Sequence, residues 1–365
     1  MNFKNKLGFG FLRIPIRGQE PDYESIHEMV DLFLAKGGKY FDTCCTYLDG
    51  KSEKAIRECV ANRYPRDQFL LANKLPGYYC KSHKDCRRYF DEELNRCGVT
   101  FFDVYMLHWL NRSHYEIAQR YDEFRFLQEV KASGEAKRIG FSYHDSSALL
   151  DEILTEHPEV DVVQLQINYL DWNTAGIESR KCYEICQRHG KQVIVMEPVK
   201  GGTLASLPTE ARSVLSALHP DWSPAIWALR FVQSLELVEV CLSGMNSMAQ
   251  VEENMAPAPP LTEQELEALW QVRDMIEAKT AVPCTGCRYC EPHCPQGISI
   301  PDCFKLFNEL YRNPADRWKI QPVYDQMALE RGSALDCLSC RTCVSHCPQH
   351  IEIPAYLQKV GAMLG

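Results

Sequence analysis

A motif of four cysteines and a proline occurs twice near the end of this 365-residue chain and restricts how that part can fold. The two copies read CTGCRYCEPHCPQGISIP at 284–301 and CLSCRTCVSHCPQHIEIP at 337–354. Each cysteine of the first copy recurs 53 residues later in the second. Two copies are too few for a solenoid, which stacks many similar units. We interpret them as a pseudo-twofold pair around two metal centres.

Both copies follow the spacing C-x2-C-x2-C-x3-C-P, which is typical of 4Fe-4S clusters. Three close thiolates bind three corners of one cubane, and in two-cluster proteins the fourth ligates the other cluster. We therefore expect two crossed sets of metal ligands, Cys284, Cys287, Cys290 and Cys347 in one and Cys337, Cys340, Cys343 and Cys294 in the other. The alternative is a pair of structural zinc sites, because C-x2-C is also a zinc half-site. Residues 280–355 resemble dicluster ferredoxin domains, with 303–327 as a helical insertion.

Composition and charge narrow the class of partner. The chain carries eighteen cysteines and a net charge of −9, with no run of lysine or arginine that would favour nucleic acid or an anionic membrane. Charges interrupt every apolar stretch before the ~18 residues of a membrane span, and the first residues lack a signal-peptide layout. We expect a cytoplasmic protein with a small-molecule substrate, in which the cysteines bind metal rather than form disulfides.

Residues 7–256 alternate short β-rich runs with amphipathic helical segments, which is typical of a parallel sheet. The predicted strands are 9–14, 39–43, 69–74, 103–108, 136–142, 162–168, 192–197 and 237–243. Eight such units fit a (β/α)8 TIM barrel, although a doubly wound sheet gives the same local pattern. The expected domains are a barrel at 1–257, a linker and helix at 258–280, and a smaller, mostly α-helical cluster domain at 281–365. The Pro-rich stretch 257–260 marks the boundary between the barrel and the linker.

The phrases YFDTCCTYLDGKSE, LLANK, DVYMLHW, RIGFS, VIVMEPVKGGTL and CLSGMNSMAQVEEN, in this order, resemble the aldo/keto reductase family. The resemblance covers nearly the whole predicted barrel and favours it over the doubly wound sheet. It implies a catalytic tetrad of Asp42, Tyr47, Lys74 and His108. Tyr47 would protonate a carbonyl oxygen, Lys74 held by Asp42 would stabilise the phenolate, and His108 would orient the substrate.

The same resemblance implies a nicotinamide site. Ser142 and Gln164 match residues that hold the carboxamide, and Glu253 and Asn254 match a pair near the adenine. Met196 stands where an aromatic ring commonly stacks on the nicotinamide. Gly244 and Gln250 stand where a lysine and an arginine often bind the 2′-phosphate of NADP. We therefore expect NADH to bind about as well as NADPH, or neither nucleotide to bind tightly.

Three functions are compatible with these features. The first is a nicotinamide-dependent carbonyl reductase or alcohol dehydrogenase in which the clusters are structural or serve a partner. The second is a reductase fed with single electrons by the clusters from a ferredoxin-like donor, with the tetrad managing protons. The third is a non-catalytic electron-transfer or interaction protein, which the complete tetrad disfavours. Cys44 and Cys45, between Asp42 and Tyr47, are either nucleophiles or small buried thiols.

Overall fold

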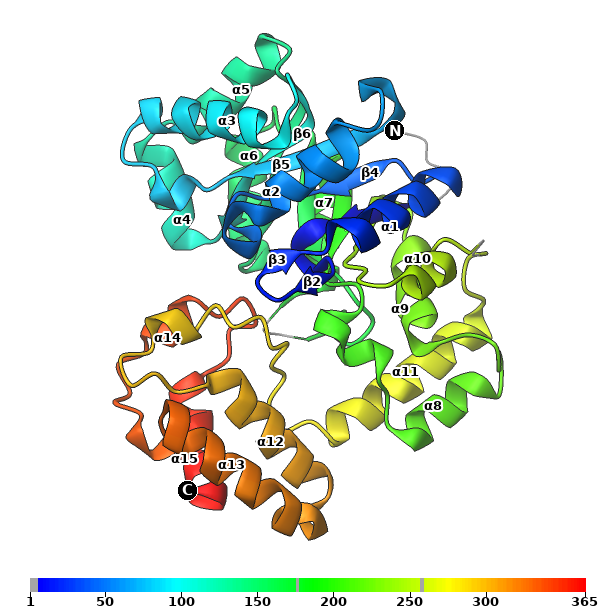
Figure 1. Cartoon of the computed structure of the whole chain (residues 1–365), viewed down its shortest axis with the longest axis vertical. Coiled ribbons are helices and arrows are strands. Elements are labelled where there is room, and N and C mark those ends of the chain that lie inside the picture. The colour runs from blue at the N-terminus through cyan, green and yellow to red at the C-terminus, as the bar shows by residue number, and fades with distance from the viewer. Residues whose placement is uncertain (1–5, 175–176, 257–258) are drawn as a thin grey trace. The chain divides into compact units, whose positions relative to one another are not determined.

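The computed structural model describes residues 6–174, 177–256 and 259–365, which form two compact units (Figure 1). The first unit contains the chain up to Pro198 and Ile226–Leu261, and the second contains Val199–Ala225 and Thr262–Gly365. The segment 199–225 thus belongs to the second unit, although it lies between two barrel strands in the sequence. The domain boundaries expected from the sequence stay a prediction, and residues 257–258 of the expected linker lie outside the described residues.

The first unit is built on a closed barrel of eight parallel strands, which confirms the predicted fold class. Its strands are β1 (Leu7–Gly10), β4 (Tyr40–Asp42), β5 (Leu70–Leu75), β6 (Phe102–Leu110), β7 (Ala136–Tyr143), β8 (Val162–Gln166), β9 (Gln192–Met196) and β10 (Val238–Ser243). Each strand pairs with its sequence neighbour, and β1 pairs with both β10 and β4 to close the barrel. A short hairpin outside it consists of β2 (Ile16–Arg17) and β3 (Glu20–Pro21).

The first strand lies earlier than the predicted range 9–14. The chain leaves the sheet after Gly10, and Phe11–Arg13 form a single 3-10 turn. Phe11 is fully buried against Phe9 and Phe41, with ring centroids 5.0 and 5.7 Å away. Aromatic packing at the end of the strand therefore produces an apolar sequence that does not continue as β structure.

Helices surround the barrel because each has one apolar stripe to bury. They are α1 (Tyr23–Ala35), α2 (Lys51–Ile56), α3 (His83–Cys97), α4 (Arg112–Arg120), α5 (Glu123–Ala132), α6 (Ser147–Glu156), α7 (Ser179–Arg188), α9 (Pro224–Gln233) and α10 (Met248–Asn254). In α1 the stripe consists of Ile26, Met29, Val30 and Phe33, all fully buried. The two-residue repeat of the strands fills the barrel itself with residues such as Tyr40, Ala72, Met106, Val162 and Ile194.

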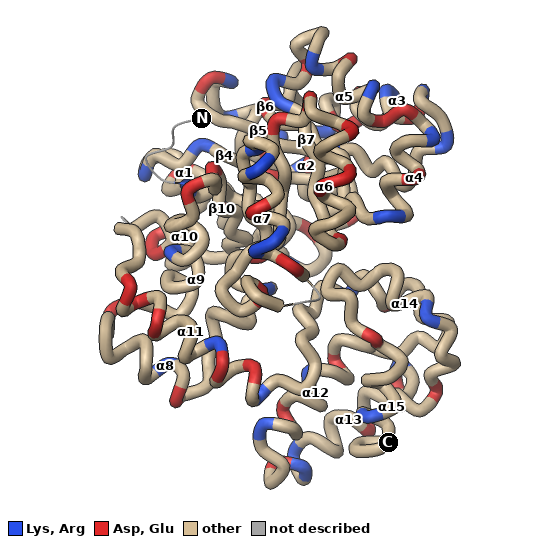
Figure 2. Tube along the Cα trace, turned by 180° about the vertical axis from the view of Figure 1, so that it is seen from behind, with Lys and Arg blue, Asp and Glu red and all other residues tan. Residues whose placement is uncertain are grey.

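The second unit is helical. It contains α8 (Thr209–Ser216), α11 (Glu263–Ala278), α12 (Ile300–Arg312), α13 (Arg317–Arg331), α14 (Thr342–Ser345) and α15 (Ile353–Leu364). Phe304, Leu310, Tyr324, Leu357 and Val360 belong to its core, and cysteines of both motifs pack against this core. Among the described residues, no helix is long and apolar enough to cross a membrane. Figure 2 shows Lys and Arg interspersed with Asp and Glu along both units.

Candidate active site

The strand repeat places polar side chains at one end of the barrel interior. Tyr40, Ala72 and Met106 point into the barrel, so the residues two positions further along β4, β5 and β6 point the same way. These residues are Asp42, Lys74 and His108. They lie at the carboxyl ends of their strands, where barrel enzymes hold their catalytic groups.

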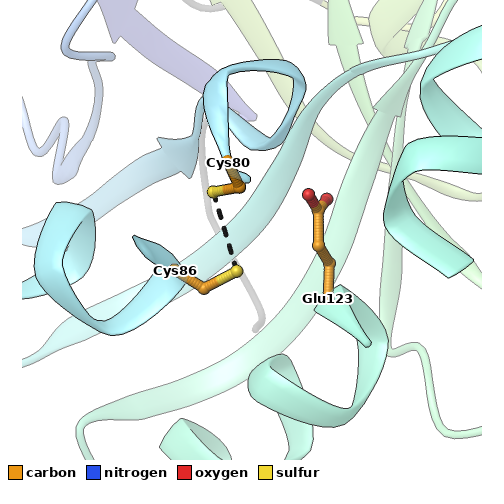
Figure 3. Close-up of side chains that lie close together, drawn as sticks. All are labelled: Cys80, Cys86 and Glu123. Carbon is orange, nitrogen blue, oxygen red and sulfur yellow. Dashed lines mark hydrogen bonds between the residues drawn. The ribbon is translucent and has the colours of Figure 1, made fainter. Parts of the chain in front are cut away.

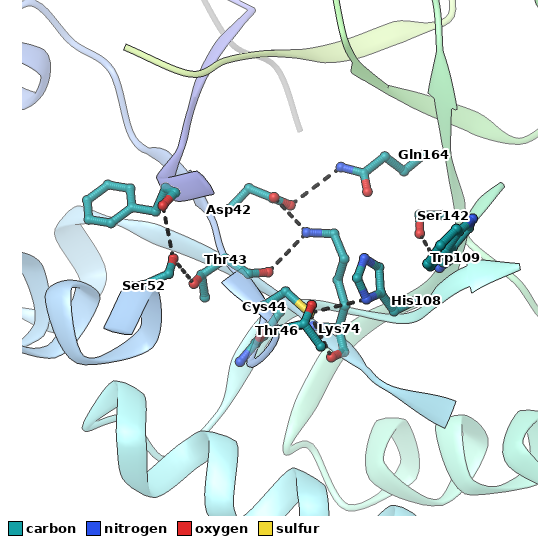
Figure 4. Close-up of polar contacts among 12 residues, drawn as sticks. Asp42, Thr43, Cys44, Thr46, Ser52, Lys74, His108, Trp109, Ser142 and Gln164 are labelled. Carbon is teal, nitrogen blue, oxygen red and sulfur yellow. Dashed lines mark hydrogen bonds and ion pairs between the residues drawn. The ribbon is translucent and has the colours of Figure 1, made fainter. Parts of the chain in front are cut away.

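Asp42 and Lys74 form a buried ion pair (Figure 4). Lys74 Nζ lies 2.6 Å from Asp42 Oδ1 and 3.0 Å from the carbonyl oxygen of Thr43, and the two side chains are 0 % and 4 % exposed. Burial raises the pKa of the Asp42 carboxyl above its usual value, and the ammonium beside it offsets only part of that increase. The pair therefore holds a positive charge at a fixed point in a region of low dielectric.

Tyr47 lies beside this charge. It begins the short helix η2 (Tyr47–Gly50) and is half-buried, with its ring centroid 4.9 Å from Lys74 Nζ. Its ring also meets the His108 ring edge to face at 5.9 Å between centroids. The structure thus brings together all four residues of the expected tetrad. A cation next to a phenol favours the phenolate form, as a proton donor in this position requires.

Cys44 contacts the histidine of this group. Its Sγ lies 3.3 Å from His108 Nδ1, and the Tyr78 hydroxyl lies 3.3 Å from the same nitrogen (Figure 4 shows the thiol). Burial acts to raise the pKa of the Cys44 thiol, but the hydrogen bond from Cys45 and the nearby His108 and Lys74 bring that pKa well below its usual value. With Nδ1 facing these partners, Nε2 is the ring nitrogen left for a substrate.

The expected nucleotide residues divide into two groups. Ser142 and Gln164 are buried on the adjacent strands β7 and β8, where Ser142 Oγ accepts the Trp109 N–H at 2.7 Å and Gln164 Nε2 lies 3.5 Å from Asp42 Oδ2. Met196 ends β9 and is half-buried. Ser142, Gln164 and Met196 lie at the same end of the barrel as the tetrad, because their strands are parallel to β4 and β5.

The second group lies after β10. Gln250 Oε1 accepts the Asn246 N–H at 2.7 Å, buried Asn254 donates to Ser243 Oγ at 3.1 Å, and Glu253 is half-buried on α10. Exposed Gly244 packs against the side chain of Arg13. The sequence did not indicate this cation, because Arg13 is more than 200 residues away along the chain.

In the second unit, the eight motif cysteines divide into two sets, each lining one cavity. Cys284, Cys287, Cys290 and Cys347 line one cavity, and Cys294, Cys337, Cys340 and Cys343 line the other. Each set takes three cysteines from one copy of the motif and the fourth from the other. All eight are free thiols, so the donor set suits a metal cluster.

Lys200 contributes a charge near the first cavity. It belongs to the second unit, is 3 % exposed, and its Nζ donates to Gln349 Oε1 at 3.1 Å. Cys284 and Cys347 both experience its positive charge. No local pattern in the sequence indicated this, because Lys200 follows a barrel strand and the cysteines follow it by more than eighty residues.

The model of the aldo/keto reductase family matches residues 6–274, most of the chain. The chain belongs to the aldo/keto reductase family. A 4Fe-4S dicluster domain matches residues 283–352 of this aldo/keto reductase, which confirms the resemblance at its C-terminal end.

Individual relatives are distant. An uncharacterized oxidoreductase, YqkF, of Bacillus subtilis is 22% identical over 66% of this chain and 85% of its own length. The NADH-specific methylglyoxal reductase of Escherichia coli is 24% identical over 47% of this chain and 56% of its own. Among solved structures, the aldo-keto reductase AKR11C1 of Bacillus halodurans has a TM-score of 0.60 at 22% identity, covering 73% of this chain and 91% of its own. An enzyme of Klebsiella pneumoniae, in complex with NADP and acetate, has a TM-score of 0.59 at 19% identity, with the same coverage.

Proposed function

We propose that this oxidoreductase reduces a carbonyl group, or oxidises the corresponding alcohol, with a nicotinamide cofactor and Tyr47 as the proton donor. The observation that carries the proposal is the buried Asp42–Lys74 pair, whose ammonium lies 4.9 Å from the Tyr47 ring centroid. An isolated buried charge is costly, so a fold that keeps one beside a phenol at a strand end favours a catalytic role over a structural one.

The tetrad divides the work of proton transfer. A carbonyl oxygen gains negative charge as its carbon is reduced, and the Tyr47 hydroxyl gives it a proton. Lys74 stabilises the phenolate left behind, and Asp42 holds Lys74 in place. His108, with Nδ1 facing Cys44 and Tyr78, presents Nε2 to the substrate oxygen and orients it.

Ser142, Gln164 and Met196 would hold the nicotinamide at this end of the barrel, and Gly244, Gln250, Glu253 and Asn254 would hold the adenosine end. The bound nicotinamide supplies hydride. Ser142 and Gln164 fit the carboxamide because both are buried polar groups on adjacent strands. Arg13 beside Gly244 is half-exposed and lies 3.9 Å from Glu197, which competes for its charge.

Calorimetry with NADH and NADPH tests the preference. We expect dissociation constants within about tenfold of each other, because neutral Gly244 and Gln250 cannot form a charge-assisted pair with the 2′-phosphate. A hundredfold preference of the wild type for NADPH would contradict this expectation. Loss of that preference in Arg13→Met would assign the 2′-phosphate to Arg13.

Tyr47→Phe tests the reaction. General acid catalysis is typically worth about 100- to 10,000-fold, so turnover of a carbonyl substrate should fall by that factor while nucleotide binding stays unchanged. Tyr311→Phe, on the exposed surface of α12, is the matched control. Equal turnover by Tyr47→Phe and wild type would refute the assignment of the proton donor.

For the second unit we propose two 4Fe-4S clusters, one in each cysteine set. Each cluster would carry single electrons, and reduced thiols as ligands agree with a cytoplasmic location. The anaerobically purified chain should contain about eight iron and eight labile sulfide. Cys294→Ala should disturb the cluster whose other ligands are Cys337, Cys340 and Cys343, whereas damage to the Cys284 set alone would show that the ligation is not crossed.

A second function is favoured by the buried Lys200. A cation beside one cysteine set suits a centre that accepts electrons, so the clusters would pass electrons from a ferredoxin-like donor to the barrel reaction. Titration with NADH, NADPH and dithionite separates the two functions. Bleaching of the cluster absorbance by dithionite alone favours the external donor, and bleaching by a nucleotide couples the clusters to the nicotinamide.

A further inference from the structure

Two thiols and a carboxyl group meet inside the first unit, away from the tetrad. Cys80 follows the 3-10 turn η5 (Gly77–Tyr79), Cys86 lies in the first turn of α3, and Glu123 begins α5. They are 3 %, 0 % and 2 % exposed, and one potential ligand atom of each lies within 4.8 Å of those of the other two. Figure 3 shows the three side chains close together, with a dashed line between the two sulfur atoms.

The distance between the sulfur atoms fits a shared metal ion. Both cysteines are free thiols, and their Sγ atoms are 3.6 Å apart. Two thiolates bound to tetrahedral zinc at ~2.3 Å are separated by ~3.8 Å along one edge of the tetrahedron. The side chains therefore already lie close to the separation that one zinc ion requires.

Glu123 has a buried carboxylate, one oxygen of which lacks a partner in the described part of the chain. Among the described residues, no group donates a hydrogen bond to its Oε1, which is buried. Burial raises the pKa of this carboxyl to about 8, and no neighbouring charge contributes to that increase. Gly77 leaves the space that the carboxylate occupies, because a β-carbon there would overlap it. A buried polar group without a partner is costly, and a bound cation would satisfy it.

We propose that Cys80, Cys86 and Glu123 bind one zinc ion, with the fourth coordination position open to water. Two thiolates and a carboxylate are donors that zinc accepts in tetrahedral geometry. On binding, the two thiols and the carboxyl release their protons to solvent.

The site would fix a loop that reaches the tetrad. Cys80 is two residues from Tyr78, whose hydroxyl lies 3.3 Å from His108 Nδ1 and whose ring stacks on His114 at 4.8 Å between centroids. Zinc would tie this loop to α3 and α5 and so hold Tyr78 over the histidine. This role rests on the proposed function, whereas the binding of zinc does not.

Metal analysis of the full chain, purified anaerobically, tests the site without substrate or nucleotide. We expect one zinc per chain in addition to iron. Cys80→Ser and the isosteric Glu123→Gln should lose zinc and keep iron, whereas Cys59→Ser, another fully buried thiol in the first unit, should keep both. Cys287→Ala should lose iron and keep zinc, which separates this site from the cluster motifs.

Zinc X-ray absorption of the wild type makes the test independent of how the variants fold. Two sulfur ligands at ~2.3 Å and two oxygen ligands at ~2.0 Å are expected. Wild-type protein without zinc, a shell of three or four sulfurs, or equal zinc in Glu123→Gln and wild type would overturn the proposal. So would a Cys80–Cys86 disulfide found by alkylation and mass spectrometry of the unreduced chain. Zinc in a chain without reductase activity would refute the proposed function alone.

Discussion

Replacing Asp42 should show that its ion pair with Lys74 serves chemistry and not stability. Removing one partner of a buried pair typically costs about 3–5 kcal/mol, because the other charge stays buried. In Asp42→Asn, Lys74 Nζ would keep its 3.0 Å contact with the Thr43 carbonyl, and the asparagine offers a neutral acceptor. We therefore expect the lower end of that range, about 3 kcal/mol.

The double variant Asp42→Asn with Lys74→Met should recover most of that loss. Replacing a buried pair by neutral groups is often neutral or stabilising. The raised pKa of the Asp42 carboxyl agrees with this, since it means that ionised Asp42 does not favour the folded state. The double variant should be inactive as a reductase, because it lacks the cation beside Tyr47. Asp42→Asn keeps that cation but not the carboxylate that holds it in place, so its turnover should fall without being abolished.

Hydrogen exchange of β5, followed by mass spectrometry, measures the effect within the first unit. A loss of 3 kcal/mol raises the exchange rate of amides that open by global unfolding by about 150-fold. Arg125→Met, which removes the exposed ion pair with Glu129, is the control and should change the free energy of unfolding by less than about 1 kcal/mol. A double variant no more stable than Asp42→Asn would refute this reasoning.

Three further predictions test charges elsewhere in the chain. Cys44→Ala removes the contact with His108 Nδ1, so kcat/KM should fall about tenfold, the effect of one hydrogen bond. Cys44→Ser should restore it. Unchanged kinetics in Cys44→Ala would contradict a positioning role for this thiol. Burial raises the pKa of Glu53 from 4.5 to about 7, so the neutral form of Glu53 favours the folded state and up to roughly 3 kcal/mol of stability is lost as pH rises from 4.5 to 7. In Glu53→Gln, hydrogen exchange of β5 should show a smaller loss of stability over this pH range. The same dependence of stability on pH in the variant and the wild type would refute the prediction. Lys200→Met should lower the reduction potential of the cluster in the Cys284 set, by ~59 mV for each tenfold change in its reduction equilibrium. The potential of the second cluster should stay unchanged in an EPR titration. Equal shifts of both potentials would contradict the position of the Lys200 charge beside the Cys284 set.

The sequence predicted what depends on local periodicity. The eight barrel strands followed from the alternation of β-rich and helical segments. Asp42, Lys74 and His108 were assigned through the family resemblance, and their positions at strand ends agree with it. The two cysteine sets also followed, because the spacing within each motif is local and the crossing is a property of the repeat. The first strand was misplaced because an apolar run that turns into a 3-10 helix has the same composition as one that stays extended.

Features that depend on distant contacts could not be predicted. Arg13 meets Gly244, and Glu123 meets Cys80, only because the barrel closes and α5 packs beside α3. The assignment of 199–225 to the second unit is similar, since nothing in its composition distinguishes it from a barrel loop. Buried acids such as Glu53 and Glu93 look like surface residues in a sequence, because charged residues are seldom fully buried.

The two proposed functions differ in where the hydrogen on the product carbon originates. Reduction of a carbonyl to an alcohol takes two electrons and two protons, and a nicotinamide delivers both electrons with one hydrogen as hydride. Two 4Fe-4S clusters also hold two electrons, one each, so the dicluster domain could supply one turnover without a nicotinamide. Tyr47 protonates the oxygen in either case.

In the nicotinamide reaction the hydrogen on carbon comes from the cofactor, and deuterium placed on the cofactor appears in the product. In the cluster-fed reaction it comes from solvent, so carbon-bound deuterium appears only when the reaction runs in deuterium oxide. The origin of that one hydrogen therefore decides whether the substrate in the barrel is reduced by a nicotinamide or by electrons from the iron–sulfur domain of the same chain.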